Sequence, residues 1–175
     1  MKRIGFIGLG NMGSKMVVNL LEANYEVIGY DINEKLIDKL TPDGLKKASS
    51  LDDISGNVDI IITMLPNGKI VEQVYETIIG HLKPNTLLTD CSTIEINAAK
   101  DLHKKCSDNN LLFLDAPVSG GVGGAENGTL TFMVGGNETP YKMMPGETIE
   151  TPCIHGVDFT SCEDCIQEYN CNGTN

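Results

Sequence analysis

The chain has 175 residues and a mass of 18.9 kDa, which suits a single ordinary domain. Hydrophobic residues make up 41% and charged residues 21%, a balance typical of a globular protein and not of a disordered one. Thirteen basic against twenty-four acidic residues give a net charge of -11, which argues against a nucleic-acid-binding surface. The apolar runs, such as residues 58–65, are far shorter than the roughly 20 residues that a membrane-spanning helix needs.

Strand-like and helix-like segments alternate along the first 140 residues. The predicted strands are residues 2–7, 26–30, 58–65, 86–90, 111–115 and 129–134. The predicted helices are residues 12–23, 33–40, 51–54, 69–79 and 94–106. The third strand is continuously apolar, as in strands that are buried on both faces of a parallel sheet. This order predicts an α/β fold, a doubly wound domain with a mostly parallel sheet.

The composition changes near residue 143. All thirteen lysines and arginines lie at or before Lys142, whereas four of the six cysteines and six acids follow it. We therefore predict a folded domain over residues 1–142 and a divergent, acidic, cysteine-rich tail over residues 143–175 that is irregular and poorly ordered. The tail offers Cys153, His155 and three further cysteines, but their spacing matches no strong zinc pattern, so we predict no metal site.

The first candidate site is a glycine-rich turn between the first strand and the first helix. Its residues are Gly8, Leu9, Gly10, Asn11, Met12 and Gly13. In this context Gly8 permits a tight turn, Gly10 lets the backbone approach a pyrophosphate, and Gly13 lets the helix pack close to the strand. The helix N-terminus adds free N–H groups and partial positive charge. The alternative is a purely structural turn.

Asp31 ends the second predicted strand, 18 residues after Gly13. A carboxylate at this place can accept the hydroxyl groups of an adenosine ribose and would repel a 2′-phosphate. Because no basic residue follows before Lys35, the sequence favours NAD over NADP. Asp31 could instead cap the next helix, and the two roles are compatible.

The second candidate site is a loop after the fifth predicted strand. It contains Ser119, Gly120 and Gly121, which offer backbone N–H groups and one hydroxyl. Neutral donors of this kind can bind a carboxylate, although a merely mobile glycine loop is the alternative.

Five ordered motifs together resemble a known family. They are Gly8–Gly13, Met64-Leu65-Pro66, Asp90-Cys-Ser-Thr93, Asp115-Ala-Pro-Val-Ser-Gly-Gly121 and Leu130-Thr-Phe-Met-Val-Gly-Gly136. Over residues 1–142 the chain resembles the N-terminal, Rossmann-type NAD-binding domain of the β-hydroxyacid dehydrogenases, in particular the 3-hydroxyisobutyrate dehydrogenases.

The resemblance implies a role for individual residues. Gly8–Gly13 would hold the NAD pyrophosphate and Asp31 the adenosine ribose, with Leu65 and Pro66 lining the cofactor. Thr93 would lie near the nicotinamide ribose, while Ser119, Gly120 and Gly121 would bind the carboxylate of a small substrate. The implied reaction is reversible hydride transfer between a 3-hydroxy acid and NAD, giving a semialdehyde.

The sequence departs from this family after residue 142. The family's catalytic lysine lies beyond the NAD-binding domain, in a long helix that leads into an all-helical second domain, and here no lysine follows Lys142. We therefore expect a truncated product, through a frameshift, an unspliced intron or an alternative exon, that binds NAD without useful turnover. A non-catalytic interaction module and a non-functional product are the alternatives.

The resemblance also bears on partners and location. A sheet face left uncovered by a missing domain would favour self-association. We expect no nucleic-acid or membrane partner. Glycines at positions 5, 8 and 10 interrupt the N-terminal apolar run, which argues against a signal peptide. The expected location is therefore the cytoplasm, or the mitochondrial matrix if a presequence is missing from this sequence.

Overall fold

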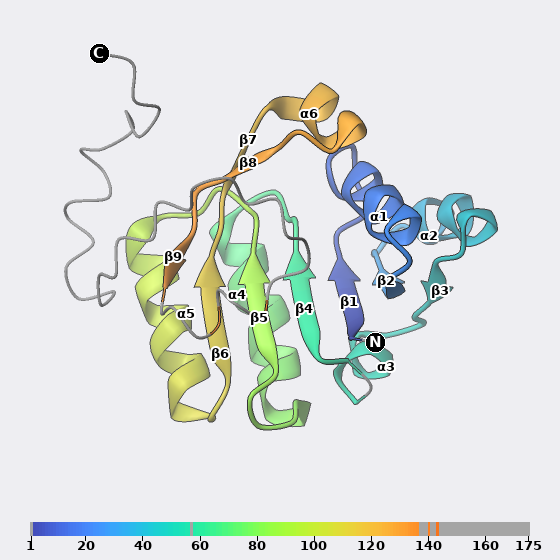
Figure 1. Ribbon diagram of the computed structural model, residues 1–175. Helices are drawn as coiled ribbons and strands as arrows, with labels where there is room; N and C mark the ends of the chain where they lie inside the picture. The colour runs from blue at the N-terminus through green and yellow to red at the C-terminus, as the bar shows by residue number, and fades with distance from the viewer. Residues whose placement is uncertain (1, 57, 137–139, 141–142, 144–175) are drawn as a thin grey trace, which may run out of the picture.

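A computed structural model describes residues 2–56, 58–136, 140 and 143. Its main feature is a seven-stranded sheet in the order β3-β2-β1-β4-β5-β6-β9 (Figure 1). The first six strands in that order are parallel, and β9 is antiparallel to β6. The strands are β1 (Arg3–Ile7), β2 (Glu26–Tyr30), β3 (Lys46–Lys47), β4 (Ile60–Thr63), β5 (Leu87–Asp90), β6 (Leu112–Asp115) and β9 (Gly135–Gly136). A separate pair, β7 (Val118–Ser119) and β8 (Thr131–Phe132), is antiparallel.

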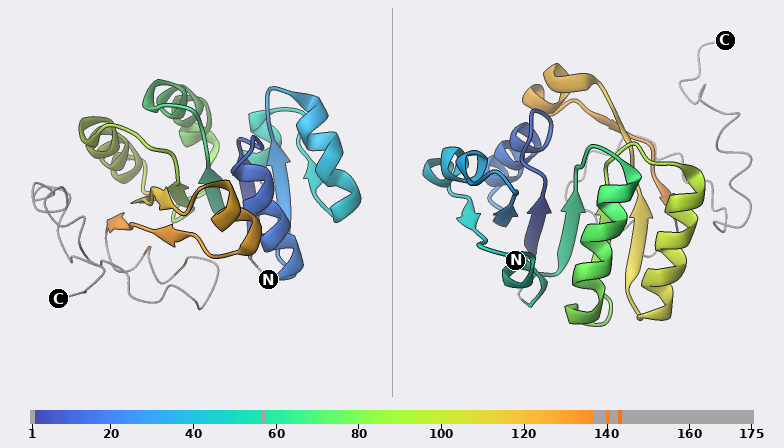
Figure 2. Two further views of the ribbon diagram at one scale, coloured as in Figure 1. Left: turned by 90° about the horizontal axis from the view of Figure 1, so that it is seen from above. Right: turned by 180° about the vertical axis from the view of Figure 1, so that it is seen from behind.

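Helices lie on both faces of the main sheet, as Figure 2 shows. They are α1 (Gly13–Glu22), α2 (Glu34–Leu40), α3 (Leu51–Ser55), α4 (Gly68–Ile78), α5 (Ile96–Asp108) and α6 (Gly121–Asn127), with 3-10 turns at Thr41–Asp43 and Ile79–His81. Met16 of α1 and Ile37 of α2 pack in one apolar cluster, whereas Ile54, Tyr75 and Leu102 of α3, α4 and α5 pack in the other. The strand order and the two covered faces confirm the predicted doubly wound, mostly parallel fold.

Local sequence signals account for several element boundaries. Asn33 caps α2 by accepting the N–H of Lys35, as predicted. Asn67 caps α4 in the same way through the N–H of Ile70, and Gly44 ends the turn after α2 with a positive φ of 109°. These residues fix where the helices begin and end relative to the sheet.

Two predictions about the glycine-rich region after β6 were wrong. Residues 121–127 form the helix α6 where the sequence predicted a loop, because Gly120 and Gly128 with positive φ flank it and α1 supports it through Asn19. The predicted strand over residues 129–134 is reduced to the two residues of β8, which pair with β7 and not with the main sheet. Tertiary packing overrode the weak helix propensity of the glycines.

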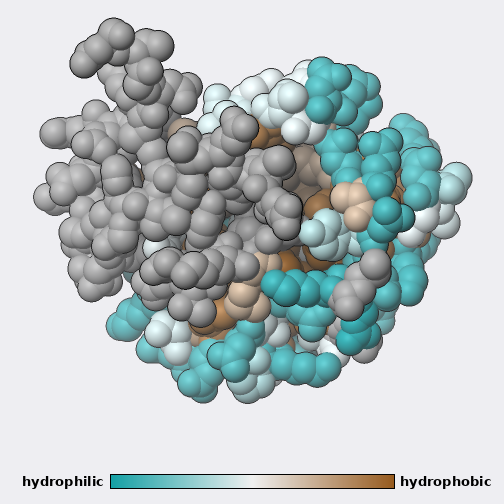
Figure 3. Space-filling view, viewed as in Figure 1, coloured by the Kyte–Doolittle hydropathy of each residue, from teal (hydrophilic) through white to brown (hydrophobic). Residues whose placement is uncertain are grey.

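On the face of the sheet that carries α1 and α2, the strands contribute Ile60, Leu87 and Leu114 to the same apolar cluster as Met16 and Ile37. Figure 3 shows this side of the molecule, where hydrophilic residues dominate the right-hand part over α2. The large hydrophobic residues exposed in the described part of the chain are Ile32, Ile96 and Val122. Self-association through this face stays a prediction. No helix among the described residues has the length and apolar character to cross a bilayer.

Candidate functional site

The candidate residues gather at the carboxyl edge of the parallel strands. The sheet reverses its direction of winding at β1, which lies between β2 and β4. The edge beside such a switch point is where doubly wound proteins bind ligands, because the flanking loops diverge there. The turns after β1, β4, β5 and β6 all leave the sheet at this edge, at the top of Figure 1.

The glycine turn after β1 is built so that side chains would not fit at two of its positions. Gly8 has a φ of 98°, and a Cβ there would collide with the carbonyl oxygen of Met64. A Cβ on Gly13 would collide with the carbonyl oxygen of Gly8. At Gly10 a Cβ would meet no protein atom within 4 Å. Gly8 and Gly13 therefore serve the fold of the turn, while Gly10 faces open space above it.

The N-terminus of α1 points into that space. No side chain caps the helix, and its first turn holds no acidic residue. Such an end presents N–H groups and the positive end of the helix dipole to an anion. Together with the free space at Gly10, this arrangement fits a pyrophosphate, and the residues present are compatible with NAD.

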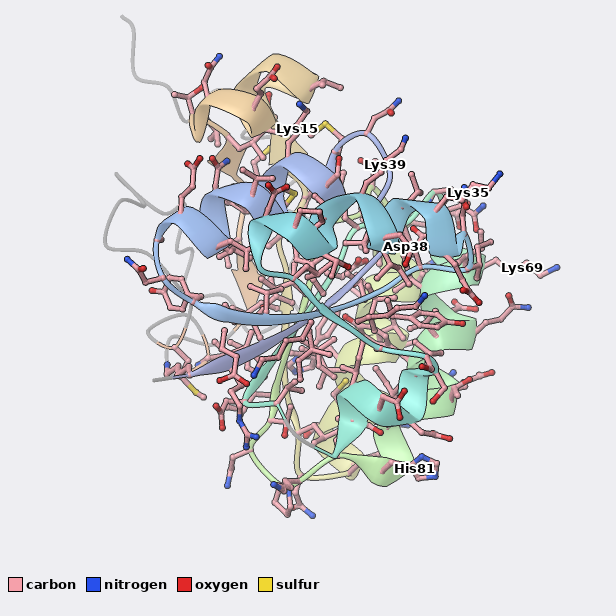
Figure 4. The ribbon with its side chains drawn as sticks, turned by 90° about the vertical axis from the view of Figure 1, so that its right-hand side faces the viewer. Lys15, Lys35, Asp38, Lys39, Lys69 and His81 are labelled. Atoms are coloured by element: carbon pink, nitrogen blue, oxygen red, sulfur yellow. The ribbon has the colours of Figure 1, made fainter. Side chains whose placement is uncertain are left out.

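Asp31 follows β2 directly and its carboxylate lies against the glycine turn. Its Oδ2 accepts the N–H of Leu9 at 2.7 Å, and its Oδ1 accepts the N–H of Asn33 at 2.8 Å. Each carboxylate oxygen has a second lone pair, so ribose hydroxyls could still bind. Figure 4 shows Lys35, the next basic residue along the chain, pointing outward from the start of α2.

The loops after β4 and β5 are joined to this turn and to each other. A Cβ on Gly8 would lie 3.0 Å from Leu65 Cδ2, so Leu65 flanks the glycine turn. The N–H of Leu65 donates to Ser92 Oγ at 2.9 Å, which links the loop of Leu65 and Pro66 to that of Thr93. Pro66 and Thr93 are exposed at this edge, as a ligand-contacting role requires.

The carboxylate of Asp90 anchors both of these loops. Its Oδ1 accepts Thr63 Oγ1 at 2.7 Å, Ser92 Oγ at 2.6 Å and the N–H of Ser92 at 3.1 Å. Thr63 Oγ1 also meets the hydroxyl of buried Tyr75 at 3.2 Å. Sequence reasoning assigned no role to Asp90 or Ser92. One sequence feature could have pointed to Asp90: both β5 and β6 are apolar strands that end in an aspartate.

The loop after β6 leads through β7 into α6, which packs against α1. Ser119 pairs with Thr131 in the β7–β8 ribbon, and Gly120 and Gly121, both with positive φ, start α6. Asn19 of α1 donates to the carbonyl of Ala125 at 2.6 Å, and Lys15 forms an ion pair with Glu126 at 2.9 Å. The helix that follows the glycine turn therefore also contacts the helix after the predicted substrate loop.

The described part of the chain holds no group of three or more His, Cys, Asp or Glu side chains that could bind a metal ion. The cysteines of residues 143–175 lie outside the described residues. Burial raises the pKa of the Cys106 thiol to about 12, and burial beside Asp90 also raises the pKa of Cys91, so neither thiol is a nucleophile at neutral pH.

The chain is similar to several known proteins. Residues 3–145 match a family model described as the NAD-binding domain of 6-phosphogluconate dehydrogenase. The mitochondrial 3-hydroxyisobutyrate dehydrogenase of Drosophila melanogaster is 44% identical over 142 residues, which are 81% of this chain and 44% of that protein. The NAD-dependent L-serine dehydrogenase of Pseudomonas aeruginosa is 44% identical over 140 residues, or 78% of this chain and 47% of that protein.

A solved structure agrees with these relatives. The 3-hydroxyisobutyrate dehydrogenase of Mycobacterium tuberculosis with L-serine superposes with a TM-score of 0.79 at 39% identity, covering 81% of this chain and 49% of that one. The chain thus spans less than half the length of each of these three proteins.

Proposed function

The chain belongs to the family defined by the NAD-binding domain of 6-phosphogluconate dehydrogenase, whose members here are hydroxyacid dehydrogenases, and we propose that it holds NAD in the turn of Gly8–Gly13. The observation that carries the proposal is the open space at Gly10 in front of an uncapped α1. Bound NAD would supply a hydride acceptor at its nicotinamide ring. In this proposal Asp31 holds the adenosine ribose.

The proposed roles of the remaining residues follow the order of the loops along the chain. Leu65 and Pro66 line the cofactor, Thr93 lies beside the nicotinamide ribose, and Ser119, Gly120 and Gly121 receive a carboxylate. Two relatives are named for 3-hydroxyisobutyrate and L-serine, which share a carboxylate and a hydroxyl on the third carbon. We therefore propose a small 3-hydroxy carboxylate as the substrate class of the intact dehydrogenase.

For these 175 residues on their own, we propose binding of NAD without catalysis. The general base that deprotonates a substrate hydroxyl contributes about 10²–10⁴-fold to such a reaction. In the resembled family this is a lysine beyond the NAD-binding domain, and the printed sequence has no lysine after Lys142. We infer that the isolated chain binds NAD and does not turn over a 3-hydroxy acid at a useful rate. The proposed domain for this role is residues 1–142.

A titration of the purified chain with NADH, followed by nicotinamide fluorescence, tests the proposal. We expect saturable binding that favours NADH over NADPH. A second assay adds 3-hydroxyisobutyrate or L-serine with NAD and follows NADH absorbance. Absence of NADH binding by a folded chain would refute the cofactor site, and substrate-dependent NADH formation would refute the lack of turnover.

A further inference from the structure

Three polar residues occupy one row of the sheet, directly beneath the loops of the candidate site. Thr63, Asp90 and Asp115 are the last residues of β4, β5 and β6 and are partners in the parallel register. Side chains of register partners point to the same face of a sheet. The row faces α4, because the Tyr75 hydroxyl of that helix meets Thr63 Oγ1. Asp90 and Asp115 are therefore neighbours on the side covered by α4 and α5.

Each of the two carboxyl groups has a buried oxygen without a hydrogen-bond partner in the described structure. In Asp90 the Oδ1 atom receives all three recorded hydrogen bonds, and Oδ2 receives none. In Asp115 the orphan atom is Oδ1. A buried acceptor without a donor costs roughly 1–3 kcal/mol, and more if it is charged. The two orphan oxygens lie on adjacent strands. A proton on one of the two carboxyl groups would turn that group into a hydrogen-bond donor.

The described titratable groups near the pair are Tyr75, Cys91, Cys106 and His103 of α5, whose ring contacts Phe113 of β6. Burial raises the pKa of Tyr75, Cys91 and Cys106, so these three groups are neutral at pH 7. Within residues 2–56 and 58–136, no lysine or arginine forms an ion pair with either carboxylate. Burial, and then the charge of Asp90, raise the pKa of Asp115 to about 7. Burial also raises the pKa of Asp90, although its hydrogen bonds with Ser92 and Thr63 oppose this.

We propose that Asp90 and Asp115 share one proton at mildly acidic pH, with Asp115 as the acid and Asp90 as the carboxylate, and that this pair positions the loops after β5 and β6. In this proposal a proton on Asp115 Oδ1 supplies a donor on the strand next to the free oxygen of Asp90, so that one proton answers both orphan atoms. Asp90 takes the charge because it already accepts three hydrogen bonds, which favour its ionised form.

The pair is connected to the loops of the candidate site through hydrogen bonds and through the chain itself. Asp90 holds Ser92, which in turn holds the N–H of Leu65, and Asp115 opens the segment that leads to Ser119. A neutral Asp115 also keeps a second negative charge away from a loop proposed to receive a carboxylate. The positioning role rests on the proposed function, whereas the shared proton does not.

Carboxyl ¹³C NMR of the full chain with labelled aspartate tests the shared proton directly. The signal of Asp115 should titrate with a midpoint near 7. In Asp90→Asn the charge of the neighbour is lost and an amide donor replaces the free oxygen, so the midpoint should fall. A wild-type Asp115 that is already ionised at pH 5, or a midpoint unchanged by Asp90→Asn, would overturn the proposal.

The positioning role is tested by comparing two variants at Asp115. The amide of Asp115→Asn can donate to Asp90 as the acid does, whereas Asp115→Ala cannot. We expect Asp115→Ala to weaken NADH binding about tenfold, the value of one hydrogen bond to a charged group, and Asp115→Asn to restore most of it. Exposed Asp108→Asn is the control for the loss of an aspartate. Equal losses in both variants, in chains that remain folded by circular dichroism, would refute the positioning role.

These experiments separate the two proposals. If wild-type chain binds no NADH, the proposed function fails while the titration of Asp115 still decides the shared proton. If NADH binds and Asp115 titrates like an ordinary aspartate, the proposed function stands and the inference about the pair is refuted.

Discussion

The carboxylate of Asp31 accepts the N–H of Leu9 at 2.7 Å, which ties the end of β2 to the glycine turn after β1. The second oxygen accepts the N–H of Asn33, at the start of α2. One side chain thereby fixes the two segments between which an adenosine ribose would lie. Asp31 shapes the site as well as offering acceptors to it, so its replacement should affect binding in two separable ways.

Asp31→Ala should weaken NADH binding by roughly 10–100-fold, because a hydrogen bond to a charged group contributes about 1.5–3 kcal/mol. Asp31→Asn keeps an acceptor for Leu9 and loses the charge, so it should bind NADPH relatively better than the wild type does. Fluorescence titrations with both nucleotides measure this.

Asp38→Ala is a matched control for Asp31→Ala. Asp38 lies on α2, is exposed and pairs with Lys47 and not with the glycine turn, as the view of α2 in Figure 4 helps to locate. We expect its NADH affinity to stay within about twofold of the wild type, since exposed ion pairs contribute little. A comparable loss in both variants would point to a general charge effect instead of a site at Asp31.

Gly10→Ala and Gly13→Ala should separate binding from folding. A methyl group at Gly10 meets no protein atom within 4 Å, so the fold should be unaffected while the group blocks the approach of a pyrophosphate. At Gly13 the same methyl collides with the carbonyl oxygen of Gly8, so the melting temperature should drop by several degrees.

Thermal unfolding and NADH titration of both variants check this pair of expectations. Gly10→Ala should melt with the wild type and lose NADH binding by at least about tenfold, a difference of 1.4 kcal/mol. Undiminished NADH binding by Gly10→Ala would show that no ligand approaches the backbone there.

Much of the fold can be predicted from local sequence signals. The contacts that support the candidate site cannot, because they join segments that are distant in the sequence. The apolar run ending at Thr63, the glycines after β1 and the cap at Asn33 each act within a few residues, so sequence pattern predicts them. The helix at 121–127 depends on contacts with α1, more than 100 residues earlier, and glycine-rich sequence hides it. The row of Thr63, Asp90 and Asp115 arises only when three strands pair in register.

The contact between α1 and α6 should control how firmly the Ser119–Gly121 loop is held. Asn19→Ala removes the 2.6 Å hydrogen bond to the carbonyl of Ala125, which we expect to cost about 1 kcal/mol. Hydrogen exchange over residues 121–128 should then be about fivefold faster, since local opening becomes easier. Lys15→Ala removes the more exposed ion pair with Glu126 and should have a smaller effect. Equal protection of residues 121–128 in Asn19→Ala and wild type would contradict this coupling.

The raised pKa of Asp115 makes the stability of the fold depend on pH in a definite direction. In the unfolded chain the pKa is near 3.8 and in the folded protein about 7, because burial and the charge of Asp90 disfavour ionisation. Between these values the folded state binds more protons than the unfolded state, so the free energy of unfolding falls as pH rises from about 4 to about 7. The separation of about 3 pH units corresponds to on the order of 4 kcal/mol.

Asp115→Asn should remove this contribution, because the amide does not ionise. Urea unfolding at pH 5, 6, 7 and 8 measures this. We expect the free energy of unfolding of the wild type to fall as pH rises, because Asp115 ionises. The variant should show a flatter profile and should be the more stable protein at pH 8. Asp108→Asn, at the exposed end of α5, keeps the wild-type profile in this comparison. If Asp115→Asn follows the wild-type pH profile, Asp115 is ionised in the fold throughout, and the two orphan oxygens must accept hydrogen bonds from a donor other than a carboxyl O–H.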